Sequence, residues 1–192
     1  MNTVNLLLSG VGGQGVILAS AILSKAALLQ GLDIKQSEVH GMSQRGGSVV
    51  SHVRIGEKVH SPLVAEGGCD ILLGFEPLEA LRFAHWVRRD GTIVYTPDRV
   101  NPSTVSAGLA EYPDDVEERL KAYPVNLVRV ESASLAEKAG NRKAANVVLV
   151  GAASRFLDFP IEVWHKAVEE SVPPKVREVN LEAFRLGREA GA

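Results

Sequence analysis

The sequence of 192 residues has little of what marks several large classes of protein. It contains one cysteine, Cys69, so the chain can form no internal disulfide, hold no iron–sulfur cluster and complete no cysteine-rich zinc site. Its net charge is only −2, which predicts no electrostatic attraction to nucleic acid or to an anionic membrane. No apolar run approaches the length of a membrane span. These absences favour a globular, cytoplasmic protein.

What is present is ordinary for such a protein, with 45% hydrophobic and 23% charged residues. The first ten residues, "MNTVNLLLSG", have no basic region before the apolar stretch, so we expect a strand there and not a signal peptide. The length suits a single domain over residues 1–192, long enough to bury a proper core.

The pattern of apolar residues predicts strands that alternate with helices. Such alternation is typical of a three-layer α/β/α fold with a mostly parallel, Rossmann-like sheet. One hairpin is expected over 48–61, turning at Gly56-Glu57, which makes the sheet mixed. From about residue 132 only helices are expected, as a C-terminal tail that either covers one face of the sheet or reaches out to a partner. The expected strands are 4–9, 32–40, 69–75, 91–96 and 125–130, and the expected helices are 14–31, 77–89, 114–123, 133–140, 141–157, 160–172 and 180–190.

The first turn of the chain is rich in glycine. Gly10, Gly12 and Gly15 fit G-x-G-x-x-G after a strand and at the start of a helix, the setting in which such turns bind a pyrophosphate. Glu38 lies roughly 20 residues further on, where a dinucleotide-binding protein places its ribose ligand. The alternative is that the glycines serve backbone geometry alone. Anion binding is slightly favoured over that alternative, and NAD binding is not; no Walker-type lysine and serine pair is present.

A second segment, "SEVHGMSQRGG", joins two expected strands and holds His40, Ser43, Gln44 and Arg45 between glycines. Arg45 offers a planar set of donors that suits phosphate or carboxylate. Since the two loops follow strands expected to be adjacent, they should lie side by side and form one anion-binding mouth. The alternative, equally weighted for Arg45, is an ion pair with Glu38 or Glu66.

The remaining candidates are expected to be structural. His40 and His52 have no partners at metal-ligand spacing, and no Ser/His/Asp set follows from spacing, so neither a metal site nor a catalytic residue is predicted. Cys69 opens a buried strand and is expected in the core. Trp86 and Trp164 are expected to be packing anchors on amphipathic helices.

Three ordered segments, "GVGGQGVILAS", "SEVHGMSQRGGSVVSHVRIG" and "CDILLGFEPLEALR", closely resemble the γ subunit or domain of 2-oxoacid:ferredoxin oxidoreductases. The second segment looks most like the β subunit of the indolepyruvate branch. The resemblance is strong over residues 4–100 and looser over the helical tail.

The resemblance implies a division of labour. A partner subunit would carry thiamine diphosphate, magnesium and the iron–sulfur clusters, while this chain would carry none of them and be inactive alone. Coenzyme A would enter near this subunit, and ferredoxin would take the electrons. The branch implies aryl pyruvates from aromatic amino-acid breakdown as substrates, in a heterotetramer. Residues carried over as lining the coenzyme A site or the partner contact are Gly12, Gly13, Gln14, Gly15, Ser43, Gln44 and Arg45. The alternatives are a stand-alone nucleotide-binding protein and a purely structural interaction module.

Overall fold

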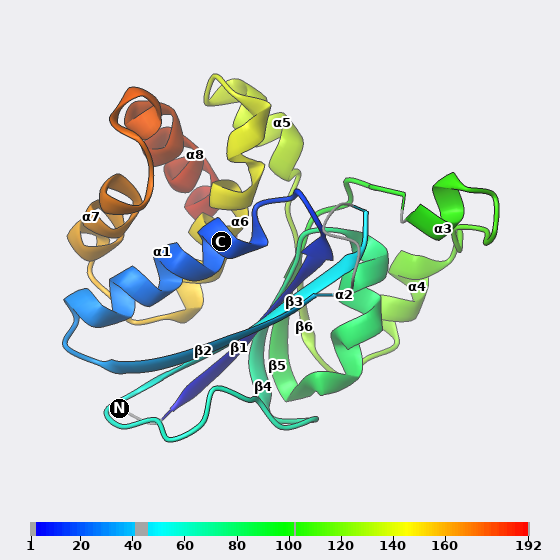
Figure 1. The fold of residues 1–192 in the computed structure, drawn as a ribbon, viewed down its shortest axis with the longest axis horizontal. Helices are drawn as coiled ribbons and strands as arrows, with labels where there is room; N and C mark the ends of the chain where they lie inside the picture. Colours follow the sequence, from blue (N-terminus) through cyan, green and yellow to red (C-terminus); the bar gives the residue numbers. More distant parts are fainter. Residues whose placement is uncertain (1–2, 41–45, 102, 192) are drawn as a thin grey trace.

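The structure is a computed structural model that describes residues 3–40, 46–101 and 103–191. Six strands in that part of the chain form one sheet in the order β2-β3-β1-β4-β5-β6 (Figure 1). The strands with consecutive apolar residues, β1 and β4, lie at its centre and are buried on both faces, as expected for strands covered by helices. The bounds of the strands are β1 Val4–Val11, β2 Asp33–His40, β3 Ser48–Gly56, β4 Cys69–Gly74, β5 Val87–Tyr95 and β6 Asn126–Arg129.

The sheet is mostly parallel, as predicted. The neighbours β1, β4, β5 and β6 pair in parallel, and only β3 is antiparallel to both of its neighbours. The hairpin predicted over 48–61 with a turn at Gly56-Glu57 is wrong, because residues 57–68 form no strand. The antiparallel pair of consecutive strands is instead β2 and β3. Both edges of β3 are already paired with β1 and β2, so no returning strand can pair with it. The Val59 N–H donates instead to the Asp33 carboxylate at 2.8 Å.

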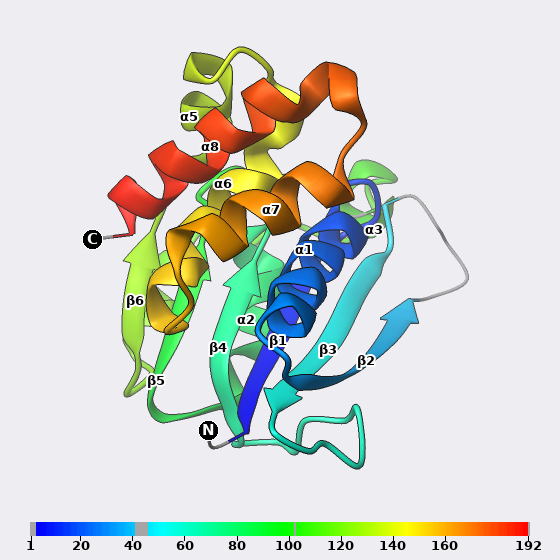
Figure 2. The same ribbon diagram turned by 90° about the vertical axis from the view of Figure 1, so that its left-hand side faces the viewer.

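Helices cover the two faces of the sheet and make three layers, as predicted (Figures 1 and 2). The N-terminal helix α1 and the C-terminal helices pack on one face around a large apolar core. The short helices α2 and α4 pack on the other face around a smaller core. The bounds are α1 Val16–Leu29, α2 Pro77–Phe83, α3 Ser103–Ser106, α4 Val116–Lys121, α5 Ser132–Lys138, α6 Ala145–Ala153, α7 Ile161–Ser171 and α8 Arg177–Ala190.

The C-terminal helices are bound tightly to the rest of the fold. Helices α6 and α8 cross at Gly151 and Gly187, and a Cβ added to either glycine would collide with the backbone of the other helix. Trp164 of α7 is fully buried and stacks on Phe184 of α8, with ring centroids 5.8 Å apart. Of the two roles considered for this tail, the structure therefore shows the first: it covers one face of the sheet.

Helix α2 is shorter than predicted. The expected helix over 77–89 ends at Phe83, a 3-10 turn follows over Ala84–Trp86, and β5 then begins at Val87. The early end has a tertiary cause, because Val87 is recruited to pair with Cys69 of β4. Trp86 accordingly lies in the turn, half-buried, with its ring 5.5 Å from that of His52.

Candidate functional site

The glycine turn joins the end of β1 to the start of α1, in the strand–turn–helix form that the sequence predicts. Gly13 and Gly15 have φ of +104° and +80°, in the left-handed region that favours glycine. The turn is closed by a hydrogen bond from the Gln14 N–H to the Val11 carbonyl oxygen at 3.1 Å. These two glycines are therefore required by the backbone, whatever the turn binds.

Both polar atoms of the Gln14 side chain form hydrogen bonds within the protein. Its Oε1 accepts the Val11 N–H at 2.7 Å, and its Nε2 donates to the Phe75 carbonyl oxygen at 2.5 Å. Phe75 directly follows β4, so the Gln14 side chain ties the carboxyl ends of two neighbouring parallel strands together. Gln14 thus supports the turn, and the ligand role that the sequence leaves open stays a prediction.

Gly15 and Gly10 permit close approaches from two other elements. The Gly15 carbonyl oxygen accepts a hydrogen bond from Asn146 Nδ2 of α6 at 3.2 Å, and a Cβ on Gly15 would lie 2.5 Å from that nitrogen. A Cβ on Gly10 would lie 2.9 Å from the Cβ of Phe75. The turn is thus held between β4 and α6, and the third glycine of the motif fits α1 against α6.

The N-terminus of α1 retains donors for a ligand. No side-chain hydrogen bond from the described residues caps this helix, and its first turn has no acidic residue. The first backbone N–H groups of a helix have no partner within it and carry a partial positive charge. The turn can therefore accept an anion such as a phosphate.

A cavity of about 440 Å³ opens on one side of the turn. It is largely apolar, and Ile17 at its edge is 60% exposed. Glu38 also lines this cavity, so the structure brings the predicted ribose ligand and the glycine motif together. The described residues that line it are Val11, Gly12, Gly13, Gly15, Val16, Ile17, Glu38 and Val49.

A second cavity, of about 200 Å³, lies on the other side of the turn, at the carboxyl ends of the parallel strands. Among the described residues, the cationic Arg99, Arg142 and Lys143 line it together with one acidic residue, Asp98. Gly13, Gln14 and Asn146 form its wall toward the glycine turn. We call this cavity the basic crevice; its other lining residues are Phe75, Thr96, Val100, Ser132, Ala133, Ala145 and Leu149.

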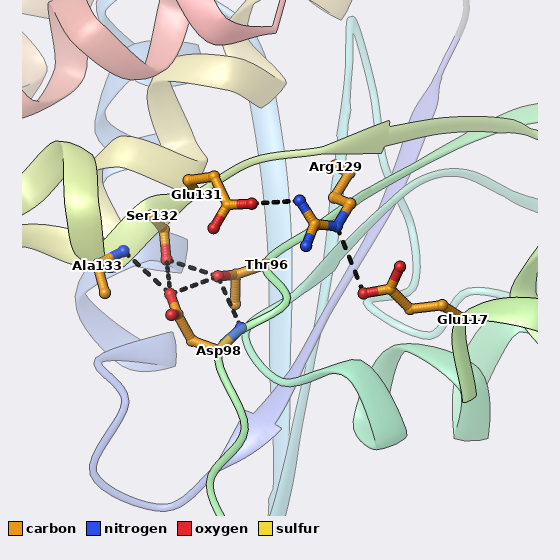
Figure 3. A network of polar contacts seen from close by, with 7 residues as sticks. All are labelled: Thr96, Asp98, Glu117, Arg129, Glu131, Ser132 and Ala133. Carbon is orange, nitrogen blue, oxygen red and sulfur yellow. Dashed lines mark hydrogen bonds and ion pairs between the residues drawn. The ribbon is translucent and has the colours of Figure 1, made fainter. Parts of the chain in front are cut away.

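Asp98 is held in place by a network at the rim of this crevice (Figure 3). Its Oδ2 accepts hydrogen bonds from the Thr96 hydroxyl at 2.6 Å, the Ser132 hydroxyl at 3.1 Å and the Ala133 N–H at 3.0 Å. Asp98 therefore fixes the start of α5 against the end of β5. Figure 3 also shows Arg129 between Glu117 and Glu131, an exposed group that keeps α4 and the end of β6 together.

Ser43, Gln44 and Arg45 lie outside the described residues, as does the Arg45 ion pair considered from the sequence, and nothing is assigned to the His40 side chain. The segment's end is described, and it meets the glycine turn: the Gly12 N–H donates to the Gly47 carbonyl oxygen at 2.9 Å. The expected proximity of the two loops is confirmed there. The expected adjacency of their strands is wrong, because β3 lies between β1 and β2.

Two buried carboxylates near the turn were not singled out from the sequence. Glu76 and Glu79, at the start of α2, are 0% and 1% exposed. Glu79 Oε2 accepts the Ser48 hydroxyl at 2.5 Å, at the point where β3 begins, and Glu76 Oε1 accepts the Tyr112 hydroxyl at 2.6 Å. Glu76 also caps α2 by accepting the Glu79 N–H at 3.0 Å. The spacing E-P-L-E, with a proline at the first helical position, is the sequence signal for this cap.

Burial sets the protonation behaviour of this cluster. Desolvation raises the pKa of Glu76, and the neighbouring Glu79 carboxylate adds to that effect. Burial and the Glu76 carboxylate together raise the pKa of Tyr112. The phenol therefore keeps its proton and donates a hydrogen bond to Glu76. Arg99 lies over the Tyr112 ring, with its guanidinium carbon 4.6 Å from the ring centroid.

Three of the residues expected to be structural, Cys69, Trp164 and His52, are buried. Cys69 is buried, and Trp164 anchors the core. His52 is buried, its Nδ1 accepts the Val64 N–H at 3.2 Å, and desolvation lowers its pKa. Within residues 3–40, 46–101 and 103–191, no three His, Cys, Asp or Glu side chains form a group that could hold a metal ion. No helix in the same ranges is long and apolar enough to cross a membrane.

The mixed six-stranded sheet, the glycine turn between β1 and α1, and the covering C-terminal helices define a three-layer α/β chain. The chain belongs to the pyruvate ferredoxin/flavodoxin oxidoreductase family, whose model matches residues 5–190. It is thus a subunit of the 2-oxoacid:ferredoxin oxidoreductase type, as its sequence predicts. The stand-alone nucleotide-binding protein and the purely structural module gain no support from the relatives.

Relatives of similar length align with this chain over nearly all of both sequences. Indolepyruvate oxidoreductase subunit IorB of Thermococcus kodakarensis is 40% identical, covering 99% of this chain and 96% of its own. IorB of Archaeoglobus fulgidus is 38% identical over 96% and 93% of the two chains. The 2-oxoglutarate synthase subunit KorC of Methanothermobacter thermautotrophicus is 33% identical over 95% and 92%.

Solved structures share the fold. The γ subunit of keto/oxoacid ferredoxin oxidoreductase from Geobacter sulfurreducens is 26% identical with a TM-score of 0.75 and covers 98% of each chain. The 2-oxoglutarate:ferredoxin oxidoreductase of Magnetococcus marinus, solved with coenzyme A bound, has the same TM-score at 18% identity. All of this chain matches 31% of that longer one, so the same fold also occurs as part of a larger polypeptide.

Proposed function

We propose that this chain is the subunit of an indolepyruvate ferredoxin oxidoreductase that carries neither thiamine diphosphate nor iron–sulfur clusters. In the complex it supports the oxidative decarboxylation of aryl pyruvates to acyl-coenzyme A, with ferredoxin as electron acceptor. The observation that carries the proposal is the 38–40% identity to IorB subunits over nearly the full length of both chains. The IorB relatives range from 34 to 40% identity and the 2-oxoglutarate synthase subunits KorC from 30 to 34%.

The division of labour follows from what this chain offers. One buried cysteine cannot ligate a cluster, so the clusters, thiamine diphosphate and magnesium belong to a large partner subunit. We place residues 1–192 in this complex as one γ-type domain, with two small and two large subunits in a cytoplasmic heterotetramer.

The glycine turn is the proposed meeting point with coenzyme A or with the large subunit. Coenzyme A carries a diphosphate and a ribose phosphate, and its thiol takes up the acyl group. The chain's residues fit such a ligand, because the uncapped start of α1 offers N–H donors and the adjoining crevice offers cations. Gly12, Gly13 and Gly15 give it access to the backbone, Gln14 supports the turn through its bond to Phe75, and we assign Ser43, Gln44 and Arg45 to the same site from the resemblance alone.

Co-expression with the large subunit tests the assignment. The purified complex should reduce ferredoxin with indolepyruvate and coenzyme A, and each subunit alone should not. Pyruvate and 2-oxoglutarate serve as comparison substrates. A complex that prefers 2-oxoglutarate would overturn the aryl pyruvate assignment, and failure of the two chains to associate would overturn the subunit role.

The Arg45→Ala variant tests the site. If Arg45 binds coenzyme A, its loss should raise the KM for coenzyme A while leaving the KM for indolepyruvate unchanged. Arg155→Ala is the matched control, since Arg155 is an exposed arginine in the 3-10 turn beyond the far end of α6. An unchanged KM for coenzyme A with weakened subunit association would instead place Arg45 at the contact between subunits.

A further inference from the structure

The basic crevice has the charge and size of a site for one phosphate group. Three cationic residues in the described part of the chain line it against one carboxylate, and that carboxylate is already bonded to Thr96, Ser132 and Ala133. At about 200 Å³ it is smaller than the usual pocket for a whole cofactor, which takes roughly 300 Å³ or more. The crevice therefore suits the anionic end of a ligand whose remainder lies outside it.

The three cations are available to such a ligand. Among the described residues, no carboxylate lies within 4.0 Å of the Lys143 ammonium. Arg99 lies 3.9 Å from the Asp114 carboxylate, with which it also lines a neighbouring hollow beside α4. Arg142 pairs with Glu137 at 3.1 Å on the surface. Exposed ion pairs of this kind contribute little free energy, so a phosphate can replace them at small cost.

Arg99 is the most constrained of the three. Its guanidinium carbon lies over the Tyr112 ring, 4.6 Å from the centroid, and the Tyr112 hydroxyl donates to the fully buried Glu76. A guanidinium held over an aromatic ring can still donate N–H bonds to a phosphate. The backbone at Lys143 is also held in place, because the Lys143 N–H donates a hydrogen bond to Asn141 Oδ1 at 3.0 Å.

We infer that the basic crevice binds a phosphate group of the coenzyme A-type ligand through Arg99, Arg142 and Lys143, with Tyr112 as the positioning residue for Arg99. The inference rests on the proposed function for the identity of the ligand. It goes beyond it by separating two sides of the glycine turn: the basic crevice takes phosphate, and the apolar cavity on the Glu38 side does not.

The direct test is titration of the purified complex with coenzyme A. Arg99→Ala and Lys143→Ala should each raise the Kd by about tenfold, the usual effect of losing a hydrogen bond between charged groups. Arg155→Ala is again the control and should leave the Kd unchanged. The same titrations with 3′-dephospho-coenzyme A identify the phosphate: the effect disappears if the crevice holds the 3′-phosphate and persists if it holds the diphosphate. Wild-type affinity in both crevice variants would overturn the inference.

The positioning role of Tyr112 is tested by a double-mutant cycle. Tyr112→Phe keeps the ring beneath Arg99 but removes the hydrogen bond to Glu76, and it should raise the Kd for coenzyme A by less than Arg99→Ala does. In the Arg99→Ala background the same change should have no further effect, because there is no guanidinium left to position. Equal effects of Tyr112→Phe in both backgrounds would show a purely structural role.

A separate measurement distinguishes failure of the inference from failure of the proposed function. Pyrophosphate is titrated into the full chain alone, wild type and Lys143→Ala. If Lys143→Ala weakens pyrophosphate binding, the crevice is a phosphate site. If the complex then shows no dependence on coenzyme A, only the proposed identity of the ligand is wrong. No measurable pyrophosphate binding, together with coenzyme A affinities that the variants do not alter, would overturn the crevice and leave the subunit assignment standing.

Discussion

The Gln14 side chain donates a hydrogen bond from Nε2 to the Phe75 carbonyl oxygen at 2.5 Å, across the carboxyl ends of β1 and β4. Its Oε1 simultaneously accepts the Val11 N–H from within the same turn. One amide group therefore satisfies backbone groups of two neighbouring strands and sets the shape of the loop between β1 and α1.

Replacing Gln14 should destabilise the chain. In Gln14→Ala the Val11 N–H and the Phe75 carbonyl both lose their partner, and unfolding in urea should show a loss of about 2 kcal/mol. Gln30→Ala is the control, because Gln30 is an exposed glutamine at the other end of α1. If both variants unfold at the same urea concentration, Gln14 is not a support of the turn.

Substitutions at two glycines with left-handed φ should separate the free-energy cost of backbone strain from that of steric contact. Gly31 has φ of +71° and nothing within 4 Å of an added Cβ, so Gly31→Ala should cost about 1 kcal/mol from strain alone. Gly15→Ala adds a clash with Asn146, so its loss of unfolding free energy should be clearly larger. The second change Asn146→Ala should recover part of the difference. Equal losses in the two single variants would mean that the contact with α6 carries no energy.

The stability of the folded chain should fall with rising pH through the ionisation of Glu76. Burial raises the pKa of this carboxyl in the folded state above its ordinary value of 4.5, so the folded state holds the proton more tightly than the unfolded chain. The corresponding stability is present below pH 4.5 and is lost as the pH rises from there through the folded pKa. Glu76→Gln lacks this loss.

Urea unfolding at a series of pH values measures the effect. The unfolding free energy of the wild type, relative to Glu76→Gln, should decline as the pH rises from 4.5. Glu111→Gln, a change at an exposed glutamate, gives the background pH dependence. A wild type that gains stability relative to Glu76→Gln over the same range would show the opposite sign and rule out this account.

Cys69 reports on unfolding. Burial raises the pKa of its thiol to about 12, so almost none of it is thiolate in the folded chain at pH 8. A thiol reagent such as 5,5′-dithiobis(2-nitrobenzoate) should therefore react only in denaturant, and the chain has no other cysteine to confuse the signal. Rapid reaction of one equivalent with the native protein would contradict the buried position.

The sequence predicts the layers and most of the elements because their signals are local. Continuous apolar runs mark the central strands, and Gly31 at φ +71° ends α1 where expected. The position of the hairpin was missed because a glycine-containing turn at Gly56 looks the same whether a strand returns beside it or not. Whether a hairpin forms at Gly56 depends on which strands pair with β3, and its hairpin partner, β2, precedes it along the chain.

The site was predicted in part for a similar reason. The left-handed glycines follow from the motif, but the use of Gln14 as a tie to Phe75 depends on a residue 61 positions away. The buried pair Glu76 and Glu79 is not evident from the sequence, because charged residues at a helix start are usually solvated. Their burial is tolerated because Tyr112 donates to Glu76, and Ser48 and Arg82 donate to Glu79.

The crossing of α6 and α8 at Gly151 and Gly187 limits how the chain can be divided. Since the two backbones touch there, no side chain fills the space between them, and a polypeptide ending before Arg177 would leave a bare strip of α6 together with the ring of Trp164 facing water. The last helix is thus the closing piece of the core, and a shortened version carrying only the sheet and the glycine turn should be recovered as aggregate.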